Sequence, residues 1–506
     1  MPDIETGCSG YAESAPPDPC VKVIFGASGD LTRRELAPAL FQLARLGLLP
    51  EQAAIIGFAR RPWNDEAFRN EMLGALEKIG PLDRNLWDSF ARRITYVQGN
   101  FDDPPSESYA RLADHIQQVR RVMGIPDNTL FHLATPPEYY PAIIDRLKAV
   151  GLTRSEQGWR RVVVEKPFGV DRASARELNR LLLEGFKEEQ IYRIDHFLGK
   201  ETVQNMLVFR FANPSFEPIW NRNFIDSVQI SVGEDIGIGT RADFYESTGI
   251  VRDMVQNHLL QLLCMVTTEP PARFDSESLR NGTYEALKAV RCLDVARDVV
   301  LGQYGPGSAA GASVPGYRQE KGVEPDSKTP TFAALRLFVD NWRWAGVPFY
   351  LRTGKRLRRK LAEVTIAFRP TPHVMFSAPE ETPREPNILT FRLQPEEGII
   401  LRFFAKQPGP EICIRPVKMR LLYAEAFGIE SPPSAYEWLL LDVMKGEQTL
   451  FARADWIEKA WSIVDPVIRY WERRPPADFP NYAAGSGGPA AADQLLEQDG
   501  RRWMSP

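Results

Sequence analysis

The 506-residue sequence has few of the features that mark secreted, metal-binding, membrane or nucleic-acid-binding proteins. Its five cysteines are odd in number, widely spread and without C-x-x-C spacing, which argues against a disulfide framework, a zinc site or a redox pair. Lys and Arg total 62 and Asp and Glu total 66, so no basic field exists to attract nucleic acid. No apolar run is long enough to span a bilayer, and the first twenty residues do not resemble a secretory signal. We therefore expect a cytoplasmic protein in a reducing compartment, with no membrane and no nucleic-acid partner.

The length of the chain exceeds what one hydrophobic core usually organises, so two or three domains are expected. In the first 200 residues, short apolar runs alternate with segments of helical spacing, which is typical of a doubly wound parallel sheet. We predict an α/β Rossmann-type dinucleotide-binding domain over residues 20–195, after a disordered extension over residues 1–19. The expected strands are Val21–Phe25, Ala54–Phe58, Ile94–Val97, Thr129–Ala134 and Arg161–Val164, and a further helix is expected at Arg172–Phe186.

Beyond about residue 200 the pattern changes, because strand-like runs follow one another directly. This succession predicts a larger α+β domain with a predominantly antiparallel sheet over residues 196–506. Helices at 249–267, 276–291 and 436–446 are expected to cover one face of that sheet. The Gly-, Pro- and Ser-rich stretch 302–330 is expected to be a functional or interface loop, and the tail after about residue 475 to be mostly irregular. The expected strands are Ser227–Val232, Phe332–Val339, Phe349–Arg352, Glu363–Phe368, Ile388–Leu393, Ile399–Phe404 and Glu411–Met419.

The first expected strand leads into a glycine turn, Gly26-Ala27-Ser28-Gly29-Asp30-Leu31, and helical spacing continues to Leu46. The N-terminus of such a helix presents free backbone N–H groups and a positive dipole, which suit the pyrophosphate of a dinucleotide. The spacing is G-x-x-G rather than G-x-G-x-x-G, and a lone glycine turn can be purely structural. Its place after the first strand favours a cofactor site.

Arg60 and Arg61 follow the second expected strand, where an acidic residue would bind the ribose 2′-hydroxyl of NAD. Guanidinium groups at this place favour the 2′-phosphate of NADP instead. The alternative is a pair of solvated surface arginines. We predict NADP as the cofactor.

Two further positions suggest chemistry. Lys166, in Glu165-Lys166-Pro167, follows a buried-looking strand, and ligands of doubly wound sheets gather at the carboxyl ends of strands. His258 lies on an apolar helix face, where a single histidine is more often a hydrogen-bonded core residue than a catalyst. Asp253 and Asn257 on the same helix indicate instead that it lines a polar cavity. A histidine there could take the proton of an alcohol as hydride leaves carbon.

The run Arg193–Glu201 places an acid, an imidazole and a lysine among apolar residues. Alone it could be a solvated turn after a strand. Together with the glycine turn, Lys166 and His258, it suits a phosphorylated substrate better than a core.

These motifs, in this order, resemble those of the glucose-6-phosphate dehydrogenases, and the resemblance runs from about residue 20 to the tail. It rests on the glycine turn, on Glu165-Lys166-Pro167-Phe168-Gly169, on the run Arg193–Glu201, on the helix Arg252–Gln261 and on Arg352-Thr353-Gly354-Lys355. It implies oxidation of glucose 6-phosphate at C1 to 6-phospho-D-glucono-1,5-lactone, with hydride transfer to NADP. It also implies a homodimer or homotetramer, and it requires no metal.

The resemblance implies a role for each candidate residue. His258 would be the general base toward the anomeric hydroxyl, and Asp195 would orient its imidazole. His196 and Lys200 would hold the substrate phosphate, and Lys355 and Lys360 would close over the substrate. The sugar hydroxyls would be bound by Lys166, which would also lie against the cofactor, and by Glu234 and Asp253. The cofactor itself would lie on Gly26, Ala27, Ser28, Gly29, Asp30, Leu31 and Arg60.

The sequence departs from the family pattern at Phe197, where a tyrosine hydroxyl is expected to reach the phosphate. One charge-assisted hydrogen bond, worth about 1.5–3 kcal/mol, would then be missing, which predicts weaker substrate binding without loss of activity. The match around Lys360 is loose, and a neighbouring arginine is the alternative there. Two other functions compete: a related oxidoreductase acting on an unphosphorylated sugar, and a catalytically silent NADP-binding regulator.

Overall fold

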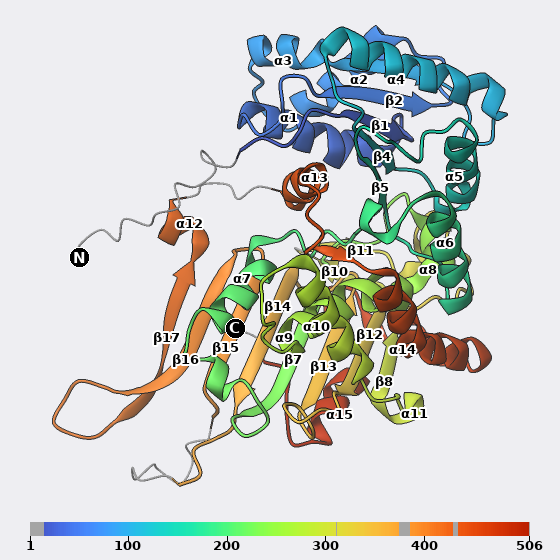
Figure 1. The fold of residues 1–506 in the computed structure, drawn as a ribbon. Coiled ribbons are helices and arrows are strands. Elements are labelled where there is room, and N and C mark those ends of the chain that lie inside the picture. Colours follow the sequence, from blue (N-terminus) through green and yellow to red (C-terminus); the bar gives the residue numbers. More distant parts are fainter. Residues whose placement is uncertain (1–14, 310, 374–384, 429–433, 505–506) are drawn as a thin grey trace.

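The computed structural model describes residues 15–309, 311–373, 385–428 and 434–504 (Figure 1). Most of the extension expected to be disordered therefore lies outside the described residues. Within them, no helix combines the length and the apolar composition that a membrane span requires.

The first sheet is the expected doubly wound one, with strand order β18-β6-β5-β4-β1-β2-β3. Strands β1 to β6 pair in parallel, and their short runs of β-branched and apolar residues are almost fully buried because helices cover both faces. The sequence pattern did not predict β18, a two-residue strand from far along the chain that pairs antiparallel with β6. The strands are β1 Val21–Phe25, β2 Ala54–Ala59, β3 Ile94–Gln98, β4 Thr129–Leu133, β5 Arg160–Val164, β6 Ile191–Ile194 and β18 Phe451–Ala452.

The helix after the glycine turn begins with a π-helical turn, η2 (Thr32–Leu36), before α1 (Ala37–Arg45) continues it. Pro38 lacks the N–H group that an α-helical bond to residue 34 would need, which accounts for the wider turn. The other helices around this sheet are α2 Asp65–Glu77, α3 Arg84–Ala91, α4 Ala110–Met123, α5 Tyr140–Ala149 and α6 Arg172–Gly185.

The second sheet has eight strands in the order β17-β16-β15-β14-β7-β13-β12-β8. All neighbours are antiparallel except β7 and β13, which run in parallel, so the expected antiparallel character is confirmed. The last strand starts at Ile414 rather than Glu411, because Lys406 at the end of β16 pairs with Ile414 and the residues between form the hairpin loop. The strands are β7 Ile225–Gly233, β8 Val299–Gly302, β12 Phe332–Phe338, β13 Pro348–Gly354, β14 Leu361–Phe368, β15 Ile388–Gln394, β16 Gly398–Lys406 and β17 Ile414–Leu422.

The predicted helix 249–267 consists of a π-helical segment, η7 (Val251–Leu259), and α9 (Leu260–Thr267), preceded by α8 (Ala242–Ile250). Together with α7 (Glu201–Phe211) and α10 (Ser276–Lys288), α9 lies over one face of the large sheet (Figure 1). The remaining helices of this half are α11 Val295–Asp298, α12 Tyr423–Phe427, α13 Ala435–Lys445, α14 Ala454–Arg473 and α15 Ala490–Glu497.

The expectation for the helix at 436–446 was wrong. Helix α13 does not cover the large sheet but packs against α1 of the cofactor side, between the two parts of the molecule (Figure 1). Its buried side chains include Leu440, Val443 and Met444. An apolar stripe shows that a helix is buried, but not which sheet it meets.

The stretch expected to be a functional or interface loop and the tail expected to be mostly irregular both contain ordered structure. In the stretch 302–330, β9 (Tyr304–Gly305) pairs with β19 (Tyr482–Ala483) from the tail. A small hairpin, β10 (Gly307–Ala309) with β11 (Ala312–Val314), follows. Tyr304, Tyr317, Tyr482 and the α15 leucines share a second hydrophobic core, so this stretch and the tail stabilise each other.

Candidate active site

The glycine turn lies at the carboxyl end of β1, beside β4. Gly26 has a φ of +81°, and a Cβ atom there would lie 2.2 Å from the carbonyl oxygen of Ala134. Only glycine fits this approach. The turn places the N-terminus of the following helix at the edge where the parallel strands end, so the residues Gly26 to Leu31 are suited to cradle a pyrophosphate.

Arg60 and Arg61 follow β2, the strand next to β1, and both are exposed. The hydroxyl of Tyr96 donates to the carbonyl oxygens of Ala59 and Arg61, each at 2.8 Å, which holds the backbone there. The Arg61 guanidinium lies 5.1 Å from the ring centre of Trp63. Two exposed guanidinium groups thus follow the strand that pairs with β1, a chemistry that could hold a 2′-phosphate.

The π-helical segment η7 brings Asp253 and His258 to the same side of one helix. Five residues span about 500° in an α-helix, which would separate these side chains by about 140°. The wider π turn, in which the N–H of Leu260 bonds to the carbonyl of Val255, reduces that separation. Sequence periodicity alone predicts an α-helix here and does not reveal the π turn.

His258 is completely buried and has a hydrogen-bond partner on each ring nitrogen. Its Nδ1 lies 2.5 Å from Oδ1 of Asp195, at the end of β6, and its Nε2 lies 2.9 Å from the Lys166 amine, at the end of β5. If Lys166 donates, Nδ1 carries the proton and Nε2 carries the lone pair. The ring is then poised to accept a proton at Nε2.

The charges around His258 and Asp195 determine which of the two groups is protonated. Burial lowers the pKa of His258, the Asp195 carboxylate opposes this, and Lys166 adds to it. Burial alone would raise the pKa of Asp195, but the coulombic attraction and hydrogen bond of His258 lower it to about 2. A neutral imidazole beside an ionised carboxylate is the combination that a general base needs.

A chain of ion pairs continues from Lys166 into the second domain. The Lys166 amine lies 3.3 Å from Oδ1 of Asp253, whose Oδ2 lies 3.8 Å from the buried Lys355 amine. Lys355, which follows β13, also pairs with Glu234, which follows β7. Lys166 and Lys355 together lower the pKa of Asp253 to about 2, against the effect of burial. Because β7 and β13 pair in parallel, their carboxyl ends lie side by side, which explains why Glu234 and Lys355 meet.

His196, Phe197 and Lys200 form the other wall of the site. The His196 ring meets the His258 ring edge-on at 4.7 Å between centres, and the Phe197 ring stacks on His258 at 4.3 Å. The Lys200 amine lies 5.4 Å from the centre of the Phe197 ring. Burial lowers the pKa of His196 far below its usual value and also lowers that of Lys200, which the charge of Glu397 raises and that of Lys360 lowers. The charge of Lys360 therefore acts on Lys200, although Lys360 itself is exposed.

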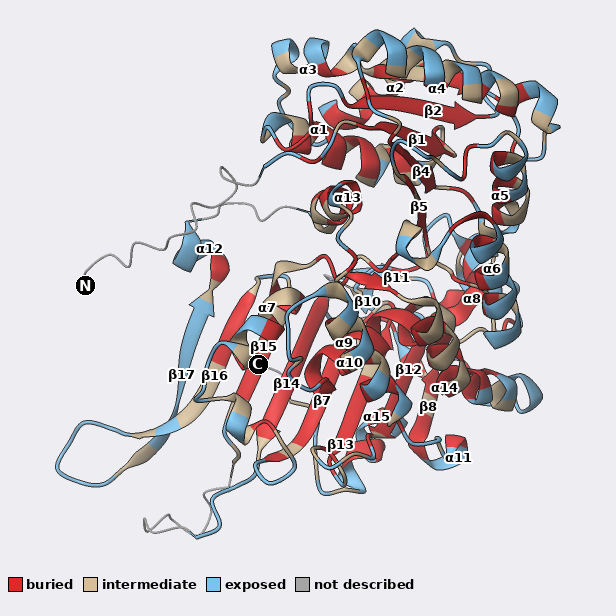
Figure 2. Cartoon of the chain, in the orientation of Figure 1, coloured by how far each residue is buried: buried red, intermediate tan, exposed pale blue. Residues whose placement is uncertain are grey.

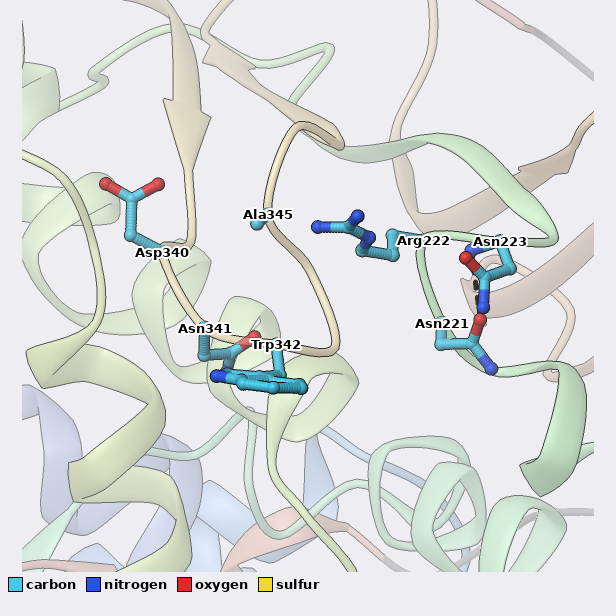
Figure 3. A pocket seen from close by; sticks show the side chains of 7 residues that line it. All are labelled: Asn221, Arg222, Asn223, Asp340, Asn341, Trp342 and Ala345. Carbon is cyan, nitrogen blue, oxygen red and sulfur yellow. Dashed lines mark hydrogen bonds between the residues drawn. The ribbon is translucent and has the colours of Figure 1, made fainter.

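A surface hollow lies elsewhere. Residues of the loop before β7 and of the loop after β12, including the 99% exposed Trp342, line a space of about 680 Å³ (Figure 3). This is the end of the sheet at which β7 and β13 begin, whereas Glu234 and Lys355 follow the residues at which they end. A strand of seven residues separates the two places by about 20 Å, so this hollow is not part of the ionisable cluster.

Comparison with known proteins identifies the family. The family model described as glucose-6-phosphate dehydrogenase, NAD binding domain, matches residues 23–205, and the C-terminal domain model matches residues 207–504. The glucose-6-phosphate 1-dehydrogenase of Chlamydia pneumoniae is 45% identical over 493 residues, 96% of each chain, and that of Mycolicibacterium smegmatis is 44% identical over 497 residues, 97% of this chain and 98% of the relative.

Two solved structures extend the comparison. A glucose-6-phosphate dehydrogenase in complex with its substrate glucose 6-phosphate superposes with a TM-score of 0.88 at 36% identity, covering 97% of this chain and all of the other. The glucose-6-phosphate 1-dehydrogenase from Mycobacterium avium gives 0.81 at 36% identity, with 97% and 99% coverage. The chain belongs to the glucose-6-phosphate dehydrogenase family.

Proposed function

We propose that the cluster around His258 oxidises glucose 6-phosphate at C1 to 6-phospho-D-glucono-1,5-lactone, with hydride transfer to NADP, as in the first oxidative step of the pentose phosphate pathway. The observation that carries this is the contact of Asp195, His258 and Lys166 beside the wall made by His196 and Lys200. We propose further that residues 20–195 bind NADP, that residues 196–506 bind the sugar and that the enzyme works in the cytoplasm.

Proton transfer is assigned to His258. A substrate hydroxyl that replaces the Lys166 amine at Nε2 can pass its proton to this nitrogen, while Asp195 stabilises the imidazolium through Nδ1. NADP, when bound on the glycine turn, accepts the hydride that leaves C1. Lys166, released from Nε2, would bind the sugar and lie against the cofactor.

Substrate binding is assigned to the two walls of the site. His196 and Lys200 would hold the phosphate, with Lys360 adding charge from outside. Because His196 is neutral when no anion is present, it would donate one hydrogen bond to the phosphate, and Lys200 would supply most of the charge. Asp253, Lys355 and Glu234, already linked to one another, would exchange these ion pairs for sugar hydroxyls.

The phosphate site is tested by the Lys200→Ala variant. Loss of one charge-assisted contact predicts a rise in the KM for glucose 6-phosphate of about 10-fold or more, with a smaller change in kcat. Steady-state formation of NADPH measures both constants. An unchanged KM would refute the assignment of Lys200 to the phosphate.

The cofactor site is tested by replacing Arg60 and Arg61 together with alanine. We expect the affinity for NADP to fall about 10-fold or more and the affinity for NAD to change little, because only NADP carries the 2′-phosphate. The matched control is the double variant Arg473→Ala, Arg474→Ala, at another exposed pair of arginines. Equal losses for the two cofactors would show that Arg60 and Arg61 only support the fold.

A homo-oligomer is proposed through the outer end of the large sheet. β17 is an edge strand that is exposed along most of its length, unlike the buried central strands (Figure 2). Val417, Met419 and Leu421 alternate along it and are 36%, 61% and 42% exposed. A long apolar edge of this kind is typical of a surface that another chain covers.

We expect the wild-type protein to be a dimer or tetramer in size-exclusion chromatography with light scattering. The double variant Met419→Glu, Leu421→Glu should dissociate, because two carboxylates would be buried without partners. Ile79→Glu, a charge placed on an exposed apolar residue of the cofactor side, should leave the assembly intact. A monomeric wild type would contradict the proposal.

A further inference from the structure

Glu165, which separates β5 from Lys166, has no role in the proton transfer or substrate binding described above. It is 7% exposed, and its carboxylate bonds to buried groups other than those that Lys166 meets. Consecutive residues of an extended chain point to opposite sides, so the position of one constrains the direction of the next. Lys166 meets His258 and Asp253, whereas Glu165 meets a separate set of buried groups.

Three elements hold Glu165. Its Oε1 lies 2.9 Å from Nε2 of the buried His132 on β4, and its Oε2 accepts a hydrogen bond of 3.1 Å from the Tyr436 hydroxyl on α13. Its carbonyl oxygen accepts another of 3.1 Å from Tyr140 on α5. Lys22 on β1 is also buried, and attraction to Glu165 partly offsets the effect of burial, which lowers the Lys22 pKa to about 7. A buried carboxylate with this many partners has little freedom to move.

Helix α13 connects this network to the phosphate-binding wall. At its C-terminal end, Arg161 of β5 donates hydrogen bonds of 2.9 Å and 2.7 Å to the carbonyls of Val443 and Met444. At its start, Gly199 approaches so closely that a Cβ atom would lie 2.8 Å from the carbonyl oxygen of Ala435. α13 thus touches β5, which leads to Lys166, and the turn that carries Lys200.

We propose that Glu165 is a positioning residue: its carboxylate, held between His132 and Tyr436, fixes the end of β5 so that the Lys166 amine stays beside His258. α13 sets this position relative to the turn of Lys200, so the proton-transfer side and the phosphate side keep a fixed separation. This inference deepens the proposed function. The expected loss of kcat/KM rests on that function, whereas the expected change in the pKa of His258 does not.

The ionisation of His258 reports where Lys166 lies. The groups that face His258 are Asp195 and His196 from the end of β6, Lys166 from the end of β5, and Asp253 from η7, which in turn pairs with Lys355. Lys166 lowers the pKa of His258, whereas the two carboxylates raise it. If Lys166 moves away, the pKa of His258 must therefore rise toward its usual value. A loss of general stability alone would not produce this change.

The experiment compares Tyr436→Phe, Glu165→Gln and the double variant with the wild type. The matched control is Tyr109→Phe, which removes a buried hydroxyl that donates to the carbonyl of Phe101, away from the site. The chain has five histidines, so carbon-13 labelling of histidine allows His258 to be titrated by NMR without any assumption about its role. The pH dependence of kcat/KM for glucose 6-phosphate is measured in parallel.

We expect Tyr436→Phe and Glu165→Gln to raise the pKa of His258 by about half a pH unit or more and to lower kcat/KM about 10-fold or more. The double variant should be no worse than the more affected single variant, because both act through one contact. Tyr109→Phe should leave both quantities unchanged. A shifted NMR titration with an unshifted pH–rate profile would support the positioning and reject His258 as the base.

The proposal is overturned if Tyr436→Phe and Glu165→Gln leave the His258 titration and kcat/KM as in the wild type. It is also overturned if their effects on kcat/KM add. Tyr436→Phe removes a single oxygen atom, so this variant provides the test even if Glu165→Gln does not fold.

Discussion

The His258→Asn variant is expected to lose about 10²-fold or more in kcat, with nearly unchanged affinity for NADP. Asparagine can still accept a hydrogen bond in the buried site, but it cannot take a proton from the substrate hydroxyl. Asp195 would then face an amide that cannot become a cation. The glycine turn of the cofactor site follows β1, and Gly26 approaches Ala134 rather than His258, so this site should not be disturbed.

The pH dependence gives the same variant a second readout. Because burial places the pKa of His258 below its usual value of 6.5, the base is unprotonated at neutral pH, and kcat/KM should fall only as the pH drops through that lowered value. This acidic limb should disappear in His258→Asn. Asp298→Asn is the control, because this buried carboxylate pairs with Arg336 away from the site. This variant should keep the acidic limb of the pH–rate profile. A His258→Asn variant with near-normal kcat would refute the role.

Much of the cofactor side follows from local sequence. The glycine turn needs a positive φ at Gly26 and close contact with Ala134, and both demands are visible as a glycine at the end of an apolar run. The same holds for β1 to β5, whose predicted ends differ from the observed ones by one residue at most. Such features depend on neighbours in the chain, which patterns report directly.

The arrangement of the site depends on contacts between distant residues, which patterns do not report. The sequence motifs pointed to Asp195 and His258, but their contact joins the end of β6 to η7, 63 positions further along the chain. The pairs Lys355–Glu234 and Glu165–Tyr436 join residues more than 100 positions apart. The position of α13 was predicted wrongly for the same reason, because its apolar face could meet either sheet.

Phe197 shows how a change at one position becomes interpretable only in the structure. Its ring stacks on His258 and lies under Lys200, so it is part of the wall that carries both roles. The expectation that one hydrogen bond to the phosphate is missing remains a prediction. Because the Phe197 ring stacks on the imidazole, it also keeps water from it, and this burial contributes to the lowered pKa of His258.

The second large effect concerns the phosphate of the substrate. Removing it would cost the contacts to His196 and Lys200, each a charge-assisted hydrogen bond or ion pair of about 1.5–3 kcal/mol. Together these contacts predict that glucose is a poorer substrate than glucose 6-phosphate by about 10³-fold in kcat/KM. The same comparison separates the proposed enzyme from an oxidoreductase for unphosphorylated sugars and from a silent NADP-binding regulator.

The most direct test of the function is therefore the rate at which the purified protein forms NADPH from NADP with glucose 6-phosphate and with glucose. We expect rapid NADPH formation with glucose 6-phosphate and a kcat/KM for glucose about 10³-fold lower. Similar kcat/KM values for the two sugars, or no NADPH with either, would contradict it.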